Sequence, residues 1–456
     1  MHFVQRCRRW SDRCRVADRF PSWQLRLALW GYAVLWGVLL PLILVYLWRR
    51  GRHDALYSAH LGERFGGHDP FPPGAIWVHA VSLGELRSAV PMIRALLDRG
   101  ERVVTTHFTP TGRREAARVF AADIAKGQIR VTWVPFELGF AYRRFFRTFA
   151  PKCGLVMEVE IWPRMIMAAR RHGVPLFMCN AQYPSKSYLR DSQKTGLRAQ
   201  VMRGFAGALV KSDLQAQRFA SVGVQNIRVT GELRFDQPLP PHLVAAGVAA
   251  RGWLGAQTRR IVTIASAVQG EDDLYITAIL GLRAAHQTQG LPPPLFIYVP
   301  RKPERFDAVD ALLASAGLPV AKRSQLMDAG LSPVGDAPQI DVLLGDSLGE
   351  MYAYLAMADT VIVGGGFTAK GAHNIIEPLA LRKPVLTGPE TWTIEFPFAE
   401  AEAAGVARSV PDGAALLAAL VESAAPDTTA IEAFFAAHSG ATQRTIVALY
   451  QLLTSR

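Results

Sequence analysis

Two successive series of short apolar segments, each alternating with helical patterns, limit the folds that this sequence can adopt. The apolar segments of the first series are residues 76–81, 102–106, 129–134, 154–157, 175–180, 208–211 and 227–230. Those of the second series are residues 261–265, 295–299, 342–344, 360–363 and 384–386. Short apolar strands that alternate with amphipathic helices are typical of parallel sheets covered by helices. The sequence therefore predicts an α/β protein with two Rossmann-like domains facing a cleft.

The domain limits follow from the composition around these two series. We expect residues 53–235 to form an N-terminal Rossmann-like domain and residues 259–426 to form a C-terminal one. The proline-rich stretch at residues 236–258 is typical of a linker. Residues 427–456 are expected to form a terminal helical segment that packs across both halves.

An uncharged segment precedes the first domain. Residues 27–48 carry no charge, have aromatic residues near both ends and are followed by Arg49, Arg50 and Arg52. At about 1.5 Å per residue the segment is about 33 Å long, which is enough to cross a bilayer. The run is too long for a signal peptide and no clean cleavage site follows it. We expect a membrane anchor, which either spans the bilayer or lies in its interface.

The charges around this anchor give conflicting indications of its orientation. Residues 1–26 form an arginine-rich extension with a composition that favours anionic lipid. Because more arginines precede the anchor than follow it, the positive-inside rule slightly favours a cytosolic N-terminus and a body on the other side. A helix in the interface, with both ends cytosolic, removes this conflict.

The overall charge narrows the kinds of partner. A formal net charge of +13 indicates an anionic partner, such as anionic lipid or a phosphorylated substrate. No RNP, zinc-finger or helix-turn-helix pattern accompanies the charge, so nucleic acid is the least favoured partner. Four cysteines show no metal-ligand spacing, and Cys153 and Cys179 fall in expected core strands. Nothing in the sequence therefore requires a metal or an oxidising compartment.

Acidic residues of the first half follow the ends of predicted strands. Glu85 lies in the first turn of a helix, just beyond a strand, at the edge where open α/β sheets bind ligands. A carboxylate there is stabilised by the helix dipole, stays ionised at neutral pH and is able to act as a general base. Glu158 and Glu160 end another strand and point to one face. Alternatively, these acids only balance the helix dipole and solvate the sheet end.

The second half has three stretches that suit a phosphate or a sugar. Residues 299–305 follow a strand and carry three cations, and the backbone N–H groups of a turn that includes Gly365 and Gly366 are placed to approach an anion. Asn374 and Glu377 share a helix face and suit sugar hydroxyls or a helix cap. The glycines match a dinucleotide fingerprint only formally, because no acid ends the next strand. No Asp-x-Asp pattern is present, which favours a metal-free reaction with a monophosphate leaving group.

Seven motifs carry a resemblance to a known family. In chain order they are VHAVSLGE, THFTPTGR, MEVEIWP, VTGELRFD, VPRKPER, LGDSLGEM and HNIIEP. Together they resemble the lipid A Kdo (3-deoxy-D-manno-octulosonic acid) transferases, from about residue 35 to the C-terminus. The resemblance implies a GT-B glycosyltransferase that moves Kdo from CMP-Kdo to a lipid IVA-type acceptor in lipopolysaccharide biosynthesis, with inversion and without a metal or other cofactor. It also implies the bacterial inner membrane, with the catalytic domains on the cytoplasmic side.

The resemblance assigns roles to individual residues. Glu85 matches the family's general base, and Glu158 and Arg234 match positions that stabilise the transition state. The family's CMP-binding segments are matched by Pro300, Arg301, Leu348, Gly349, Glu350, Asn374, Ile375, Ile376 and Glu377, to which the glycine turn adds Gly365 and Gly366.

Three positions depart from the family pattern. Arg234 replaces a lysine, Gln182 replaces an arginine, and Val268 stands where a donor-side histidine is usual. These departures leave open the alternative that the chain is a divergent family member with another acceptor. Two further alternatives are a GT-B transferase or epimerase that uses another nucleotide sugar, and a non-catalytic membrane protein that binds lipid or a sugar nucleotide.

Overall fold

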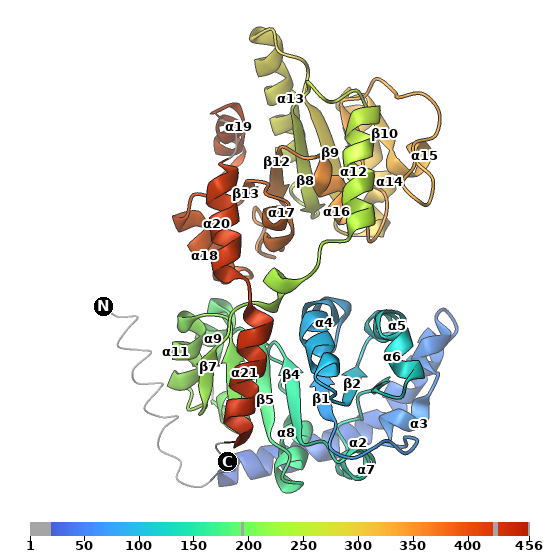
Figure 1. Ribbon diagram of the computed structural model, residues 1–456, viewed down its shortest axis with the longest axis vertical. Helices are drawn as coiled ribbons and strands as arrows, with labels where there is room; N and C mark the ends of the chain where they lie inside the picture. The colour runs from blue at the N-terminus through green and yellow to red at the C-terminus, as the bar shows by residue number, and fades with distance from the viewer. Residues whose placement is uncertain (1–19, 193–195, 423–426, 455–456) are drawn as a thin grey trace. The chain divides into compact units, whose positions relative to one another are not determined.

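The computed structural model describes residues 20–192, 196–422 and 427–454, and they form two α/β units (Figure 1). Unit 1 comprises the described residues of Met1–Gln237 and Gly440–Arg456, and unit 2 comprises those of Pro238–Ser439. Of the arginine-rich extension predicted for residues 1–26, residues 1–19 lie outside the described residues.

Unit 1 is built on a seven-stranded parallel sheet with the order β3-β2-β1-β4-β5-β6-β7. Its strands are β1 (Ile76–His79), β2 (Val103–His107), β3 (Ile129–Trp133), β4 (Cys153–Met157), β5 (Leu176–Ala181), β6 (Gly207–Val210) and β7 (Ile227–Val229). All seven strands predicted for the first series are present, with ends shifted by one or two residues. The order reverses between β1 and β4, so the carboxyl ends of these two strands define a crevice suited to a ligand.

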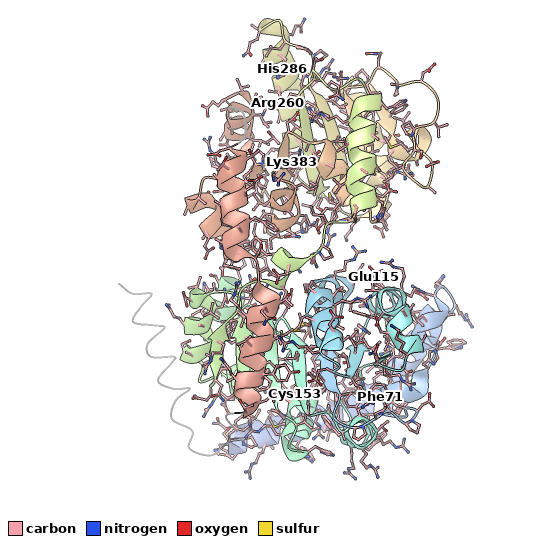
Figure 2. The ribbon with its side chains drawn as sticks, in the orientation of Figure 1. Phe71, Glu115, Cys153, Arg260, His286 and Lys383 are labelled. Atoms are coloured by element: carbon pink, nitrogen blue, oxygen red, sulfur yellow. The ribbon has the colours of Figure 1, made fainter. Side chains whose placement is uncertain are left out.

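Helices cover both faces of this sheet. They are α3 (Leu61–Arg64), α4 (Leu83–Asp98), α5 (Pro110–Val119), α6 (Ala121–Ala125), α7 (Gly139–Phe149), α8 (Pro163–Arg171), α9 (Ser185–Ser192), α10 (Leu197–Met202), α11 (Asp213–Ser221) and α21 (Ala441–Thr454), with 3-10 turns η1 (Ala55–Tyr57) and η2 (Leu233–Asp236). Side chains alternate across β1: Ile76 and Val78 pack in the cluster that includes α4 and α21, whereas Trp77 packs in the cluster that includes α7 and α8. Cys153 in β4 (Figure 2) and Cys179 in β5 are buried free thiols, as their apolar neighbourhoods predict.

Unit 2 contains a second seven-stranded parallel sheet with the order β10-β11-β9-β8-β12-β13-β14. Its strands are β8 (Ile261–Ala267), β9 (Leu295–Pro300), β10 (Val320–Lys322), β11 (Val342–Leu344), β12 (Thr360–Val363), β13 (Val385–Thr387) and β14 (Ala407–Ser409). The sequence did not predict the edge strands β10 and β14, because both are short and only partly buried. The order reverses between β8 and β12, which again defines a crevice at the carboxyl ends.

The helices of unit 2 include one in the segment that the sequence assigned to a linker. They are α12 (Pro241–Trp253), α13 (Asp272–Thr288), α14 (Phe306–Ser315), α15 (Arg323–Leu326), α16 (Met351–Met357), α17 (Ile376–Ala380), α18 (Glu395–Ala403), α19 (Gly413–Glu422) and α20 (Thr428–His438), with the 3-10 turn η3 (Pro303–Arg305). In α12, Pro241 occupies the first turn, where proline is favoured, so the proline cluster begins a helix. This helix packs closely on α16, since a Cβ at Gly247 would lie 2.2 Å from the carbonyl oxygen of Ala353.

The terminal segment contributes one helix to each unit, in line with the expectation that it packs across both halves. Helix α20 belongs to unit 2 and α21 belongs to unit 1. The backbone N–H groups of Gly440 and Thr442, at the start of α21, donate to the carboxylate of Asp236 at 2.6 and 2.5 Å. These bonds join the chain end to η2, which carries Arg234.

The uncharged segment forms α2 (Trp23–Gly51), which lies along the surface of unit 1 (Figure 1). It is the one helix among the described residues that is long and apolar enough to cross a membrane. Its buried or half-buried positions recur at helical spacing over the whole helix and include Leu25, Leu29, Tyr32, Trp36, Leu40, Ile43 and Leu47. The ring of Trp36 lies 5.9 Å from that of Phe136. The opposite face, with Trp30, Val38 and Leu42, is exposed.

Candidate functional site

The crevice of unit 1 contains Glu85, held in place by the turn before α4. Ser82 is the N-cap of this helix, and its hydroxyl donates to Glu85 Oε1 at 2.9 Å. The backbone N–H of Val81 donates to Oε2 at 2.8 Å. The side chain is buried, and each carboxylate oxygen therefore has a fixed position and accepts one hydrogen bond.

Burial raises the pKa of Glu85 to about 7, and the negative charges of Glu158 and Glu160 act in the same direction. The hydrogen bonds from Val81 and Ser82 oppose this shift only in part. The expectation that Glu85 stays fully ionised at neutral pH is therefore wrong, because desolvation outweighs the stabilisation available at a helix N-terminus. A pKa near the working pH suits a general base, which must take up a proton during the reaction.

Glu158 and Arg234 lie beside this carboxylate. Glu158 directly follows β4 and has a left-handed backbone, with φ of 55°. Arg234, in η2, places Nη2 at 3.3 Å from Glu158 Oε1. Both side chains remain partly exposed, with 27% and 36% of their surface accessible for Arg234 and Glu158. The structure thus brings together all three residues that the resemblance assigns to catalysis.

A buried ion pair that the sequence reasoning missed supports this group. Lys211 Nζ lies 2.6 Å from Glu232 Oε2, and both side chains are almost fully buried. Asn180 Nδ2 donates to Glu232 Oε1 at 2.7 Å, and Gln182 Oε1 accepts from Lys211 at 3.2 Å. Although burial alone would raise it, the pKa of Glu232 is lowered to about 2 by Lys211 and Arg234. The sequence feature that indicates this pair is a lysine at the end of a buried strand, together with the glutamate of the GELRFD motif.

We expect Lys211→Met to lower the free energy of unfolding by about 3–5 kcal/mol, because it leaves the Glu232 carboxylate buried and unpaired. Since the folded-state pKa of Glu232 is depressed, this contribution is present above about pH 4 and is lost as the pH falls towards 2. Urea unfolding measures the change. The exposed Lys126→Met is the control and should stay within about 0.5 kcal/mol of the unchanged protein. An equal effect of both variants would contradict the role of the pair.

Two of the three cations predicted after β9 are exposed. The side chains of Arg301 and Lys302 are solvent-accessible and make no ion pair among the described residues. Arg305 instead donates to both carboxylate oxygens of Asp272, at 2.7 and 2.6 Å, and is therefore structural. The backbone N–H of Arg301 donates to the carbonyl oxygen of Ala267 at 2.9 Å, which fixes the turn after Pro300.

A second group of positive charge surrounds His373. Burial, together with the charges of Arg301 and Lys370, lowers the pKa of His373 to about 4. The imidazole is therefore neutral at pH 7, and its buried Nε2 has no hydrogen-bond partner among the described residues. Two cations and an unpartnered ring nitrogen make this edge of unit 2 suited to an anionic ligand with polar groups.

The glycine turn after β12 does not match the expectation of an open anion site. The buried carboxylate of Glu271 accepts from the N–H of Gly365 at 2.8 and 2.9 Å and from that of Phe367 at 3.0 Å. The Gly365 N–H is thus already used by a side chain of unit 2. At Gly366 a Cβ would lie 2.5 Å from Thr387 Oγ1, so glycine is needed there for close packing.

The remaining predicted donor residues follow β11 and β12 at the same edge of the sheet. Glu350 accepts from Arg323 Nη2 at 2.6 Å and from the hydroxyl of Tyr354 at 3.2 Å, so its carboxylate is part of an internal network. Leu348 is 70% exposed, and Gly349 has φ of 86°. The Glu350 side chain is therefore engaged within unit 2, whereas Leu348 in the loop before it is exposed.

The predicted donor residues at the start of α17 are likewise partly buried and partly accessible. Asn374 Oδ1 accepts from the N–H of Ile376 at 3.0 Å, one residue ahead of the N-cap Ile375, and α17 has no side-chain cap hydrogen bond. Ile375 and Ile376 are buried, and Glu377 is half-buried at the surface of the helix. Among the residues that the structure describes, no group of three or more His, Cys, Asp or Glu is arranged to hold a metal ion, and metal independence stays a prediction.

Solved structures share this architecture. Glycyrrhiza uralensis UGT73P12, complexed with glycyrrhetinic acid 3-O-monoglucuronide, aligns over 84% of this chain and 96% of its own, with a TM-score of 0.56 and 12% identity. The UDP-GlcNAc 2-epimerase of Neisseria meningitidis aligns over 84% and 100%, with a TM-score of 0.51 and 14% identity. At these identities the likeness concerns the fold, and two parallel-sheet α/β units of this kind define the GT-B class.

Sequence relatives identify the family within that class. Residues 59–237 match the family described as 3-deoxy-D-manno-octulosonic-acid transferase (kdotransferase). The 3-deoxy-D-manno-octulosonic acid transferase of Bordetella pertussis is 42% identical over 90% of this chain and 96% of its own length. That of Haemophilus influenzae is 30% identical over 77% and 80%. The chain belongs to the Kdo transferase family and is a glycosyltransferase.

Proposed function

We propose that this protein transfers Kdo from CMP-Kdo to a hydroxyl group of a lipid IVA-type acceptor, with inversion and without a metal ion. The family membership supports the transferred sugar. The observation that carries the mechanism is the buried Glu85, whose two carboxylate oxygens are oriented by Val81 and Ser82 and whose pKa is about 7.

In the proposed reaction Glu85 accepts the proton of the acceptor hydroxyl. The acceptor oxygen then forms a bond to the anomeric carbon of Kdo as the bond from that carbon to the CMP phosphate oxygen breaks, and CMP leaves as an anion. Arg234, oriented by Glu158, supplies positive charge that stabilises negative charge in the transition state. Arg301 and Lys370 are suited to the departing phosphate.

The donor nucleotide separates this proposal from its main alternative, a GT-B enzyme that uses a UDP-sugar. The purified full chain in detergent, with EDTA, should release CMP from CMP-Kdo generated in situ when lipid acceptor is present. It should release no UDP from UDP-GlcNAc or UDP-glucose. Release of UDP, or CMP release that requires an added metal ion, would contradict the corresponding part of the proposal.

We further propose that α2 lies in the membrane interface on the cytoplasmic side of the inner membrane. A spanning helix would carry the groups packed against it into hydrocarbon, including the buried carboxylate of Glu137, which is hydrogen-bonded to Tyr32 of α2. An in-plane helix leaves unit 1 in water and inserts only the exposed face, which includes Trp30, Val38 and Leu42. It also removes the conflict in the positive-inside rule.

This placement predicts that both ends of α2 lie on one side of the membrane. In a background without Cys7 and Cys14, single cysteines from Gln24→Cys and His53→Cys should both react with an impermeant thiol reagent in inside-out vesicles. Neither should react in intact spheroplasts. Reaction of one position from each side would mean that α2 spans the bilayer.

A further inference from the structure

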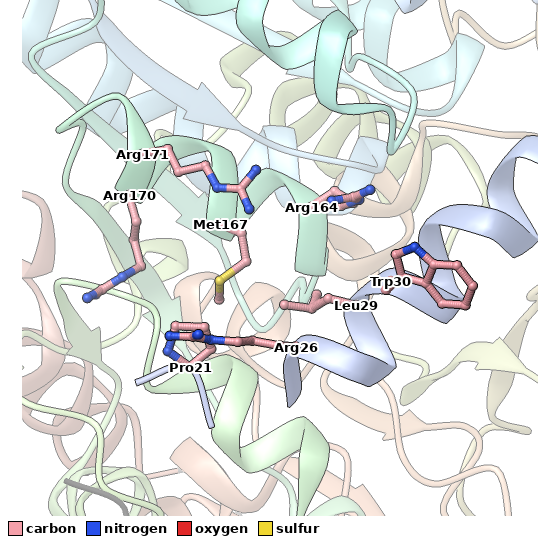
Figure 3. A pocket seen from close by; sticks show the side chains of 8 residues that line it. All are labelled: Pro21, Arg26, Leu29, Trp30, Arg164, Met167, Arg170 and Arg171. Atoms are coloured by element: carbon pink, nitrogen blue, oxygen red, sulfur yellow. The ribbon is translucent and has the colours of Figure 1, made fainter. Parts of the chain in front are cut away.

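A cavity with a strongly cationic lining lies between the start of α2 and the outer face of α8 (Figure 3). Its volume is about 560 Å³, and its lining includes Arg26, Arg164, Arg170 and Arg171. Trp30 and Met167 add apolar walls. This volume is in the range of pockets that hold small molecules, and the mixture of guanidinium groups and apolar surface suits an amphiphilic anion.

The cavity is held open by contacts that dock the start of α2 on unit 1. The hydroxyl of Ser22 donates to Gln200 Oε1 at 2.6 Å, and Leu25 is only 2% exposed. The Arg170 guanidinium lies 4.7 Å from the centre of the Phe20 ring. Because these contacts join α2 to α8 and α10, the cationic groups are brought together without a bound ligand.

The positive charge of this lining is not balanced by the described part of the protein. None of the four arginines makes an ion pair with a described carboxylate, and the lining contains no acidic residue. Arg164 Nε is buried and has no hydrogen-bond partner among the described residues. A buried donor without a partner is costly, and guanidinium groups are well suited to phosphate oxygens.

The lining runs along α8, from Arg164 in its first turn to Arg170 and Arg171 at its end. Arg170 and Arg171 precede β5, so they lie towards the amino edge of the sheet. Glu85 lies beyond the carboxyl edge, at the other end of the strands. With α2 in the membrane interface, the cavity opens beside a helix whose exposed Trp30 belongs at the level of the lipid headgroups.

We propose that this cavity binds the phosphate group of an anionic phospholipid of the same membrane leaflet, with Arg26, Arg164 and Arg171 supplying the positive charge. This inference rests on the membrane placement of α2 but not on the transfer reaction. Bound lipid would fix the orientation of unit 1 on the membrane surface.

Native mass spectrometry of the full chain in a neutral detergent tests the cavity. We expect short-chain phosphatidylglycerol to bind with one molecule per chain and short-chain phosphatidylcholine not to bind. The double substitution Arg26→Gln with Arg171→Gln should weaken phosphatidylglycerol binding by about thirtyfold, given the usual contribution of each cation near a lipid surface. Lys126→Gln with Arg228→Gln removes the same charge from exposed positions elsewhere on unit 1 and should change binding by less than about twofold.

Three results would overturn the proposal. Equal weakening in both double variants would mean non-specific attraction by charge. Competition by inorganic phosphate at the same concentration as the lipid would mean a site for a free anion, and stronger displacement by lipid IVA would assign the cavity to the acceptor. Transfer of Kdo to detergent-dispersed acceptor is measured in the same preparations. If the unsubstituted protein shows no transfer, the proposed function fails, but the lipid-binding result for the cavity still stands.

Discussion

Glu85→Gln should lower kcat for Kdo transfer by about a thousandfold while leaving the affinity for CMP unchanged. General base catalysis contributes a factor of this order, and an amide cannot accept the proton of the acceptor hydroxyl. The amide keeps the size of the side chain, and its oxygen is able to accept the hydrogen bond from the Val81 N–H, so the turn before α4 should remain intact. CMP affinity is the internal control, because the predicted CMP-binding residues all lie in unit 2.

The pH dependence gives the same prediction a second measurement. Because the base acts in its ionised form and has a pKa of about 7, kcat/KM of the unsubstituted protein should fall about tenfold per unit below pH 7 and level off above it. Glu160→Gln removes one negative charge that raises this pKa, so it should keep activity and move the inflection to lower pH. Substantial transfer by Glu85→Gln, or an unchanged inflection in Glu160→Gln, would contradict the role of Glu85.

Arg301→Ala should lower kcat by about a hundredfold and also weaken CMP binding. The group that departs is a phosphate, and removal of one positioned donor at developing negative charge has an effect of this order. Since the Arg301 side chain is exposed and makes no ion pair with the described residues, the fold should be retained.

A structural readout accompanies this loss of activity. After burial, the charge of Arg301 is the largest influence that lowers the pKa of His373, so Arg301→Ala should raise this pKa, as measured by NMR titration. Arg408→Ala is the matched control, because its guanidinium is 60% exposed and lies 3.6 Å from a carboxylate that is also exposed. An equal loss of activity in the control, or full activity in Arg301→Ala, would exclude the assigned role.

The two sheets were predictable because their central strands are buried on both faces and therefore appear as short apolar runs. The strands β10 and β14 lie at the sheet edge and were missed, since half-buried three-residue strands leave no such run. The helix α12 was missed for a different reason. Its prolines occupy the N-cap and first turn, where the composition of a linker and that of a helix start are alike.

The candidate site was predictable where charged residues of the motifs directly follow the end of a strand. Glu85, Glu158 and Arg234 were named from motifs, and the structure brings them together. The pKa of Glu85 was not predictable, because it depends on burial and on two acids more than seventy residues away. The use of the glycine turn by Glu271, and the pairing of Lys211 with Glu232, are contacts between distant segments that spacing along the chain does not reveal.

The mass of the lipid product shows whether this protein transfers Kdo to lipid IVA. Purified full-length protein in detergent is incubated with CMP-Kdo generated in situ, lipid IVA and EDTA, and the lipid fraction is analysed by mass spectrometry. We expect lipid IVA increased by the mass of one or more Kdo residues, and no such product with Glu85→Gln. Unmodified lipid IVA in the presence of released CMP would contradict the proposed acceptor, and no turnover at all would contradict the assignment of this chain as a Kdo transferase.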